Sequence, residues 1–375
     1  MARPRCAILL GILLTSSLMV SASDDGGWSY DGKLRFESAD GRFRLDFINR
    51  LQARLTTSNP ELGDSGQSFD VERFRLMLDG KAYDHWAFTV QADLATGSLS
   101  DDEEDSDLLL DAFVRFAKWR GAQLWVGQGK VGFGRQQMID TGRMQFVDRS
   151  IATERFTHGR DVGFAVVGHN QDRTYEYSVG LYNGNGINDD VDENKDHLAA
   201  GRLVVYPLGP MPLTETDPNW TARPGPRLAL GVAVMTNNSG DGSFEEERIN
   251  SAALEFAFRV RGLTMAAEFF TESEDDPPPP SPLGDESDTD GWYAQIGYAF
   301  PITEQTMLEF AGRYSEILFD VADADQTETG AAVSLYLNGH GSKLQLDYRV
   351  LEFEGTPFGS NIDTDEARLQ FQLIF

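Results

Sequence analysis

Alternation of apolar and polar residues with a period of two runs through almost the whole chain, and few folds satisfy it. In the segment Phe43–Leu55 the odd positions are mostly apolar and the even positions mostly charged or amide-bearing. Successive side chains of a β-strand point to opposite faces, so such a segment is a strand between an apolar and a polar environment. The same alternation returns in the last residues, Ala367–Phe375.

The number and length of these runs indicate a barrel that crosses a membrane. We count about sixteen runs of about 9–12 residues, the length a tilted strand needs to span the hydrocarbon layer. Short turns alternate with long polar loops, as in an up-and-down barrel with short periplasmic turns. The sequence therefore predicts an all-β fold, a 16-stranded antiparallel transmembrane β-barrel over residues 43–375. One connection, Leu208–Pro226, breaks the alternation, because it is long and falls where a short turn is expected.

The N-terminus has the three parts of a secretory signal peptide. Arg3 and Arg5 precede the apolar run Ala7–Val20, and small residues follow. We predict a signal peptide over residues 1–22 and a periplasmic N-terminal segment over residues 23–42. Cys6 is the only cysteine, so the exported chain is expected to contain neither disulfides nor cysteine–zinc sites.

The net charge of the chain limits the kinds of molecule that it can bind. The chain has 32 basic and 60 acidic residues, a net charge of −28, which argues against nucleic acid. The acids concentrate in the long loops, where we interpret them as a solvated rim. An alternative is that they bridge divalent cations to lipopolysaccharide. Neither metal-ligand spacing nor a nucleophile–base constellation is visible, so we expect no cofactor, no metal and no enzymatic activity.

Gly127, Gly129 and Gly132 match the spacing G-x-G-x-x-G of dinucleotide-binding turns. That site needs a helix after the third glycine. Here Gly134 and Gly142 interrupt the sequence and no apolar set keeps a period of 3.6. We interpret the glycines as the end of the fifth strand, where the backbone turns away from the wall.

The connection that follows, Lys130–Arg160, differs from the other long loops in charge. It contains six bases and three acids, and so carries +3. A connection of this length without evident secondary structure is uncommon unless it is functional. Its charge and glycine content predict a third loop that folds into the lumen.

Arginine on the polar strand faces suggests anion chemistry. A guanidinium stays charged and presents planar donors, which replace the water that an oxyanion loses in a narrow pore. Several moderate sites in series permit release as well as binding. The alternative is that the arginines pair with lumenal acids and stabilise the wall. The candidate anion-binding or constriction residues are Arg50, Arg54, Arg73, Arg75, Lys130, Arg135, Arg143 and Arg160.

Several segments resemble the phosphate-selective porin O/P family of Gram-negative outer membranes. They include SADGRFRLDFINRLQARL, LWVGQGKVGFG, MQFVDRSIATERFTHGRDVGFAV and the closing ARLQFQLIF. The resemblance covers most of the chain and implies a sixteen-stranded barrel, commonly a homotrimer, in outer-membrane lipid and lipopolysaccharide. It also implies a basic constriction, for which Arg73 with Arg135 or Arg143 are the best candidates, flanked by Lys130 and Arg160.

We therefore predict a passive porin that prefers small inorganic anions, with phosphate or polyphosphate as candidate solutes. The chain departs from the family in its scarce lysine and strongly acidic outer loops, which repel a dianion over about one Debye length, ~8 Å. Two alternatives remain open. One is a general or differently selective porin without phosphate specificity. The other is a structural or adhesive barrel with cation-binding loops.

Overall fold

The computed structural model forms one antiparallel sheet that closes on itself. It describes residues 26–61, 63–95, 108–189, 196–216, 225–239, 247–275, 286–319, 325–354 and 362–375. The predicted signal peptide and most of the acidic loop residues lie outside these ranges. Among the described residues, no helix is both long and apolar enough to cross a membrane.

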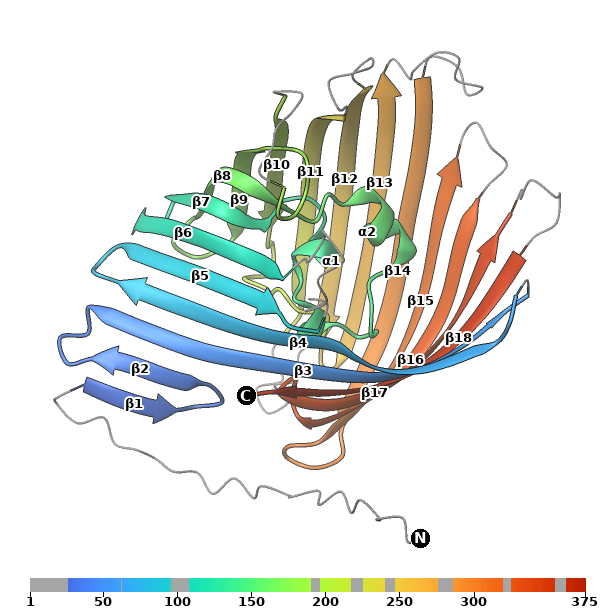
Figure 1. Ribbon diagram of the computed structural model, residues 1–375, viewed down its shortest axis with the longest axis horizontal. Helices are drawn as coiled ribbons and strands as arrows, with labels where there is room; N and C mark the ends of the chain where they lie inside the picture. The colour runs from blue at the N-terminus through green and yellow to red at the C-terminus, as the bar shows by residue number, and fades with distance from the viewer. Residues whose placement is uncertain are drawn as a thin grey trace, which may run out of the picture.

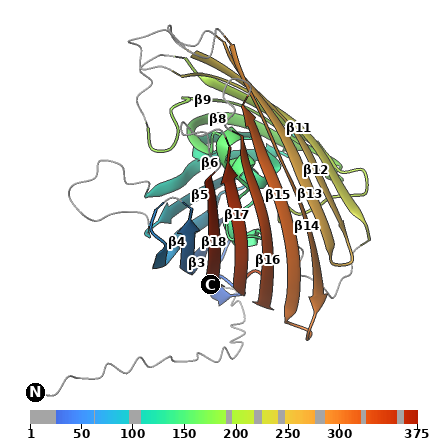
Figure 2. The same cartoon turned by 90° about the vertical axis from the view of Figure 1, so that its right-hand side faces the viewer.

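Sixteen strands, β3 to β18, make the barrel wall (Figures 1 and 2). Their bounds are β3 Phe43–Pro60, β4 Gly66–Ala82, β5 Trp86–Asp93, β6 Leu109–Trp119, β7 Ala122–Lys130, β8 Arg160–His169, β9 Tyr175–Tyr182, β10 Leu198–Val205, β11 Arg227–Ser239, β12 Glu247–Val260, β13 Leu263–Asp275, β14 Glu286–Pro301, β15 Met307–Phe319, β16 Gln326–Asn338, β17 Ser342–Phe353 and β18 Ile362–Ile374.

The last strand closes the barrel against the first. β18 pairs with β3 from Thr364 opposite Pro60 to Ile374 opposite Arg50. The Phe375 amide then donates to the Asn49 carbonyl at 2.9 Å. Closure leaves no unpaired edge along this seam, which matters because exposed strand edges aggregate. The predicted 16-stranded antiparallel barrel is confirmed.

A short hairpin precedes the barrel. β1 (Gly26–Tyr30) pairs with β2 (Leu34–Ser38), and β2 pairs with residues 44–47 of β3. This hairpin covers the part of β3 that β18 does not reach. Lys33 and Arg35 fix it by ion pairs to the buried Asp46 carboxylate at 2.7 and 2.6 Å.

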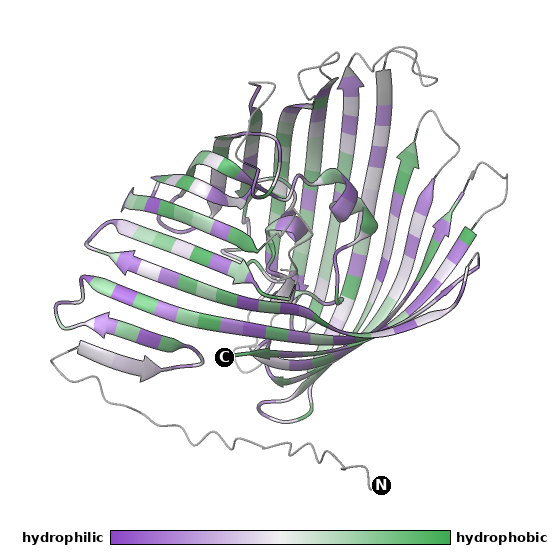
Figure 3. Cartoon of the chain, in the orientation of Figure 1, coloured by the Kyte–Doolittle hydropathy of each residue, from purple (hydrophilic) through white to green (hydrophobic). Residues whose placement is uncertain are grey.

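The barrel wall carries apolar side chains on its outer face and polar side chains on its inner face, the reverse of a water-soluble protein. On β4, Leu76 is exposed on the outer face, whereas Arg73 and Arg75 are largely covered and contact acids inside the barrel. Figure 3 shows the same alternation of hydrophobic and hydrophilic residues along the other strands. Large apolar side chains are exposed outside, as expected of a surface that contacts lipid. The predicted sidedness of β4 is confirmed.

The connection between β7 and β8 lies inside the barrel (Figure 1). It contains α1 (Arg135–Met138), the 3-10 turn η1 (Thr141–Arg143) and α2 (Ile151–Phe156). These short helices carry no 3.6-residue apolar period in the sequence. Local side chains cap two of them, Asp140 at η1 and Ser150 at α2, whereas α1 is capped by a distant residue. The Glu268 carboxylate of β13 accepts the Arg135 and Gln136 amides at the start of α1.

Apolar contacts hold this connection against one side of the wall. Val131, Phe133 and Phe156 are about 1% exposed and belong to a cluster with Phe270 of β13. The rings of Phe156 and Phe270 are stacked, with centroids 5.5 Å apart. The loop is therefore a packed part of the interior.

Gly127 lies on β7, three residues before the loop begins. Its φ is 131°, and a Cβ there would lie 2.2 Å from the Ala112 carbonyl oxygen, so only glycine fits.

Candidate functional site

The centre of the lumen is a carboxylate surrounded by three guanidiniums. Asp148 of the third loop accepts from Arg54 at 2.8 and 2.9 Å, from Arg73 at 3.1 Å and from Arg368 at 3.1 Å. Burial alone would raise the pKa of the Asp148 carboxyl, but Arg73, Arg54 and Arg368 together hold it well below its usual range. The carboxylate stays ionised at neutral pH. The three arginines have further acidic partners, since Glu72 lies 3.3 Å from Arg54 and Asp347 lies 2.7 Å from Arg368, so bases and acids balance in this group.

A second carboxylate, Asp140, lies in the same loop. It is ion-paired with Arg50 of β3 and accepts the Gly142 amide at 2.7 Å. Burial would raise the pKa of Asp140, but Arg50 and Lys130 hold it well below its usual range. Arg50 therefore anchors the loop to the wall.

Arg75 serves the wall as well as the loop. Its Nε donates to Asp93 of β5 at 2.7 Å, and a second nitrogen lies 3.4 Å from the Thr141 hydroxyl. Arg160, at the end of the loop, is paired with Asp111 of β6 at 2.9 Å. Each of these cations thus has a carboxylate partner.

Two other cations hold main-chain carbonyls. The Lys130 ammonium donates to the carbonyls of residues 137, 138 and 139 at 2.7, 3.3 and 2.9 Å. Arg149 donates to carbonyls of the same stretch at 3.3–3.4 Å. Burial, with Arg73 and Arg160 nearby, lowers the pKa of Arg149 to about 10, so it remains cationic at neutral pH. Neither side chain has a carboxylate ion-pair partner among the described residues.

The two loop arginines named as constriction candidates occupy different positions. Arg135 is the first residue of α1 and is 2% exposed. Its guanidinium donates to the Pro212 carbonyl at 3.3 Å. Arg143 ends η1 and its side chain is exposed, although Gly142 and Met144 on either side are buried. Within the described part of the chain, Arg143 has no carboxylate partner. Only Arg143 of this pair is presented to water.

Further around the wall, lumenal arginines pair with acids on the adjacent strand or, for Arg202 of β10 and Glu255 of β12, across the strand between them. In three of these pairs the arginine Nε donates to the carboxylate at 2.6–2.7 Å, and in the fourth, Arg313–Glu328, a terminal guanidinium nitrogen contacts the carboxylate. The pairs are Arg202–Glu255, Arg349–Glu366, Arg368–Asp347 and Arg313–Glu328. This part of the lumen matches the interpretation in which arginines stabilise the wall.

Sequence reasoning did not single out three of the central residues, Asp148, Arg149 and Arg368. Arg368 shares strand parity with Gln370 and Gln372, so its lumenal orientation was readable. Its place beside Arg54 depends on barrel closure, since 314 positions separate the two residues in the chain. Parity therefore places a residue in the lumen but does not select its neighbours.

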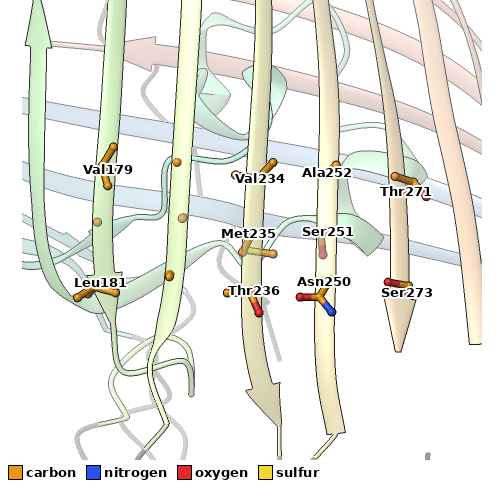
Figure 4. A pocket seen from close by; sticks show the side chains of 14 residues that line it. Val179, Leu181, Val234, Met235, Thr236, Asn250, Ser251, Ala252, Thr271 and Ser273 are labelled. Carbon is orange, nitrogen blue, oxygen red and sulfur yellow. The ribbon is translucent and has the colours of Figure 1, made fainter. Parts of the chain in front are cut away.

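A hollow of about 790 Å³ lies outside this central group, on the wall formed by β9 to β13 (Figure 4). The exposed side chains of Val179, Leu181 and Val234 line it, and the third-loop helices lie behind the strands in this view. Its lining contains no charged residue. The hollow therefore shares no residue with the group around Asp148. No group of histidine, cysteine and acidic side chains suited to a metal ion occurs among the described residues.

Comparison with known proteins gives a family and a set of similar folds. Residues 39–375 match the family described as phosphate-selective porin O and P. No curated protein matches the chain.

Solved porins share the fold at low sequence identity. The anion-selective porin from Comamonas acidovorans is 10% identical with a TM-score of 0.60, covering 88% of this chain and 100% of that one. The outer membrane channel DcaP of Acinetobacter baumannii is 13% identical with a TM-score of 0.59, covering 91% and 99%. The trimer form of OmpT, an outer membrane protein of Vibrio cholerae, is 11% identical with a TM-score of 0.55, covering 88% and 99%.

Proposed function

This chain belongs to the phosphate-selective porin O and P family of outer-membrane barrels, and from that premise we propose that it is a passive channel with a preference for small inorganic anions. The observation that carries the proposal is the charge of the third loop. Among the described residues, four of its six bases have no carboxylate partner: Lys130, Arg135, Arg143 and Arg149. Of its three acids, Asp140 and Asp148 are paired with arginines of the wall, and Glu154 has no basic partner.

The chemistry follows from that imbalance. An oxyanion entering the lumen exchanges hydration water for guanidinium donors in a medium of reduced dielectric. Arg143 is the exposed donor, and Arg54, Arg73 and Arg368 add guanidinium donors around Asp148. Small anions, phosphate among them, are the solutes that this arrangement favours. The porin from Comamonas acidovorans, which has a similar fold, is anion-selective and supports the same proposal.

A second candidate function is a general porin without strong ion preference. The four wall ion pairs from Arg202–Glu255 to Arg368–Asp347 favour it, because they use guanidiniums to satisfy lumenal acids. The acidic outer loops, which lie outside the described residues, would also attract cations to the mouth. Salt separates the two contributions, since 1 M salt reduces the Debye length to about 3 Å.

The test is the reversal potential of the purified protein in a planar bilayer under a KCl gradient, at low and at high salt. We expect anion preference that grows as the outer loops are screened, and block of the chloride current by inorganic phosphate. Arg143→Ala should lower both. The control is Arg42→Ala, which removes an exposed arginine that lies 5.5 Å from the Tyr83 ring, outside the lumen. Cation preference that persists at high salt would reject the proposal.

The proposal also covers the oligomeric state and the cellular location of the protein. We propose a homotrimer in the outer membrane of a Gram-negative bacterium, with the exposed apolar wall against lipid and neighbouring copies. Cross-linking of native membranes, followed by electrophoresis without heating, tests the trimer. A monomeric band under those conditions, with the barrel still folded, would contradict this part.

A further inference from the structure

The long connection between β10 and β11 enters the barrel from the short-turn end. Its described part, residues 206–216, includes Met211, Thr214, Glu215 and Thr216, which are 1–7% exposed. Connecting segments normally run over the surface, because buried main-chain groups need partners. Burial of a connection at this end of the barrel therefore requires specific contacts.

Those contacts bracket the third loop at the residues on either side of Met144. The Arg143 carbonyl accepts from the Glu215 amide at 3.0 Å and from the Thr214 hydroxyl at 3.2 Å. The Glu215 carboxylate accepts the Gln145 amide at 2.7 Å through one oxygen, and the Gln136 side-chain amide at 2.7 Å through the other. Glu215 thus ties α1 to the stretch that carries Arg143.

The same segment is fixed to the barrel wall. The Thr216 hydroxyl donates to the Glu309 carboxylate of β15 at 2.8 Å. The Thr214 carbonyl accepts from Arg259 of β12. The His340 ring, in the turn before β17, lies 3.2 Å from the Thr216 carbonyl. Glu215 is therefore held rigidly on one side while it holds the third loop on the other.

The charge of Glu215 is used in an unusual way. Among the described residues it forms no ion pair, and both of its oxygens accept from neutral N–H donors. A carboxylate offers an acceptor at both positions, whereas the amide of glutamine places an NH₂ group against one of these donors. Hydrogen bonds to a charged acceptor are also stronger than neutral ones. The site thus requires a carboxylate, even though a negative charge beside the pore disfavours anions.

We propose that Glu215 is a positioning residue for ion selectivity, which holds the main chain of residues 143–145 so that the Arg143 guanidinium projects into the open lumen. The constriction is then built from both ends of the barrel, by the third loop and by residues 212–216. This inference rests on the anion preference proposed above and adds the element that orients its exposed donor.

The experiment exploits two opposite expectations for Glu215→Gln. Removal of a negative charge by itself raises anion preference, because Coulomb attraction of cations is lost. Loss of positioning lowers it, by about fivefold if one guanidinium charge moves several Å from the ion path. We expect the decrease. The matched control is Glu304→Gln, the same substitution at an exposed glutamate in the turn between β14 and β15.

A double-mutant comparison and a chemical probe accompany the electrical measurement. Arg143→Ala should reduce anion preference in the wild-type background and have little effect in the Glu215→Gln background. Met144→Cys reports on the loop itself, because Met144 is 0% exposed and the chain has no cysteine beyond Cys6. A water-soluble thiol reagent should leave this cysteine unmodified in the presence of Glu215 and modify it in the Glu215→Gln variant.

Each outcome decides the proposal. An increase in anion preference, or an unmodified cysteine in the Glu215→Gln variant, overturns it. If that variant does not assemble, Glu215→Asp keeps the charge but shortens the side chain by one methylene, which draws the carboxylate away from the Gln145 and Gln136 donors, and protection of the cysteine there also overturns it. If the wild-type channel itself prefers cations, the proposed function fails, while the thiol result still decides whether Glu215 holds the loop.

Discussion

Replacing Asp148 with asparagine removes one charge from the centre of the lumen and keeps the shape of the side chain. In the wild-type protein this carboxylate faces Arg54, Arg73 and Arg368 at 2.8–3.1 Å. In the Asp148→Asn variant the three guanidiniums keep Glu72 and Asp347 as acidic partners, but one negative charge is lost and the group becomes net positive. We expect a marked increase in anion preference.

The magnitude follows from Coulomb's law. One charge changes the energy of a monovalent ion about 8 Å away by ~0.5 kcal/mol in bulk water and ~2 kcal/mol at an effective dielectric of about 20. The sign is opposite for anions and cations, so the permeability ratio responds to twice this energy. Even the aqueous limit changes the ratio by roughly fivefold, since 1.4 kcal/mol corresponds to a factor of ten. The Asp148 side chain is only 15% exposed, which places the expected effect above that limit.

The assay is the reversal potential in a planar bilayer under a KCl gradient, with inorganic phosphate as a blocker in a second series. Asp84→Asn is the control, because Asp84 is exposed in the turn between β4 and β5. Electrophoresis with and without heating verifies that the variant barrel is folded.

A folded Asp148→Asn channel with unchanged selectivity would refute this reasoning. It would mean that ions pass beyond the reach of the Asp148 charge, and that the surrounding arginines serve the wall alone. A shift toward cations would refute it more directly, because no electrostatic effect of removing a negative charge has that sign. In that case the third loop has moved, and the cysteine reporter at position 144 would detect the movement.

Two further predictions concern the third loop. Lys130→Met removes the ammonium donor from three carbonyls at the end of α1. Arg149 still reaches the Gln137 and Ile139 carbonyls, so the Met138 carbonyl is the one left without its side-chain donor, at a cost of about 1–3 kcal/mol. Open-channel current noise and protease cleavage of the loop should increase, whereas Lys118→Met, an exposed control, should change neither. The depressed pKa values of Asp140 and Asp148 mean that their stabilising ion pairs are fully present above the unfolded carboxyl pKa of about 3.9 and are lost only as the pH falls through the lower folded values. The difference in reversal potential between wild type and Asp148→Asn should therefore be constant from about pH 5 to pH 8, and a titration of this difference inside that window would contradict the assignment.

Local sequence determined the wall of this protein. Each strand lies between lipid and water, so each side chain faces one of these two environments. The residues therefore alternate between apolar and polar with a period of two, which is visible without the structure. The same parity assigned Arg50, Arg54, Arg73 and Arg75 to the lumen. The unusual positive charge of residues 130–160 was likewise readable in the sequence.

Tertiary structure decided which lumenal groups meet. Asp148 lies beside Arg368 because the barrel closes and the third loop crosses it, and neither distance is encoded within a strand. The helix α1 exists because Glu268 of β13 caps it, and residues 212–216 enter the lumen because the third loop supplies their hydrogen-bond partners. Strand parity depends on immediate neighbours in the chain, whereas the contacts of the third loop with the wall join residues that are far apart in the chain, as with Arg155 and Glu272. The sequence by itself thus specified a basic third loop, and only the folded chain determined that Arg143, and not Arg135, is its exposed donor.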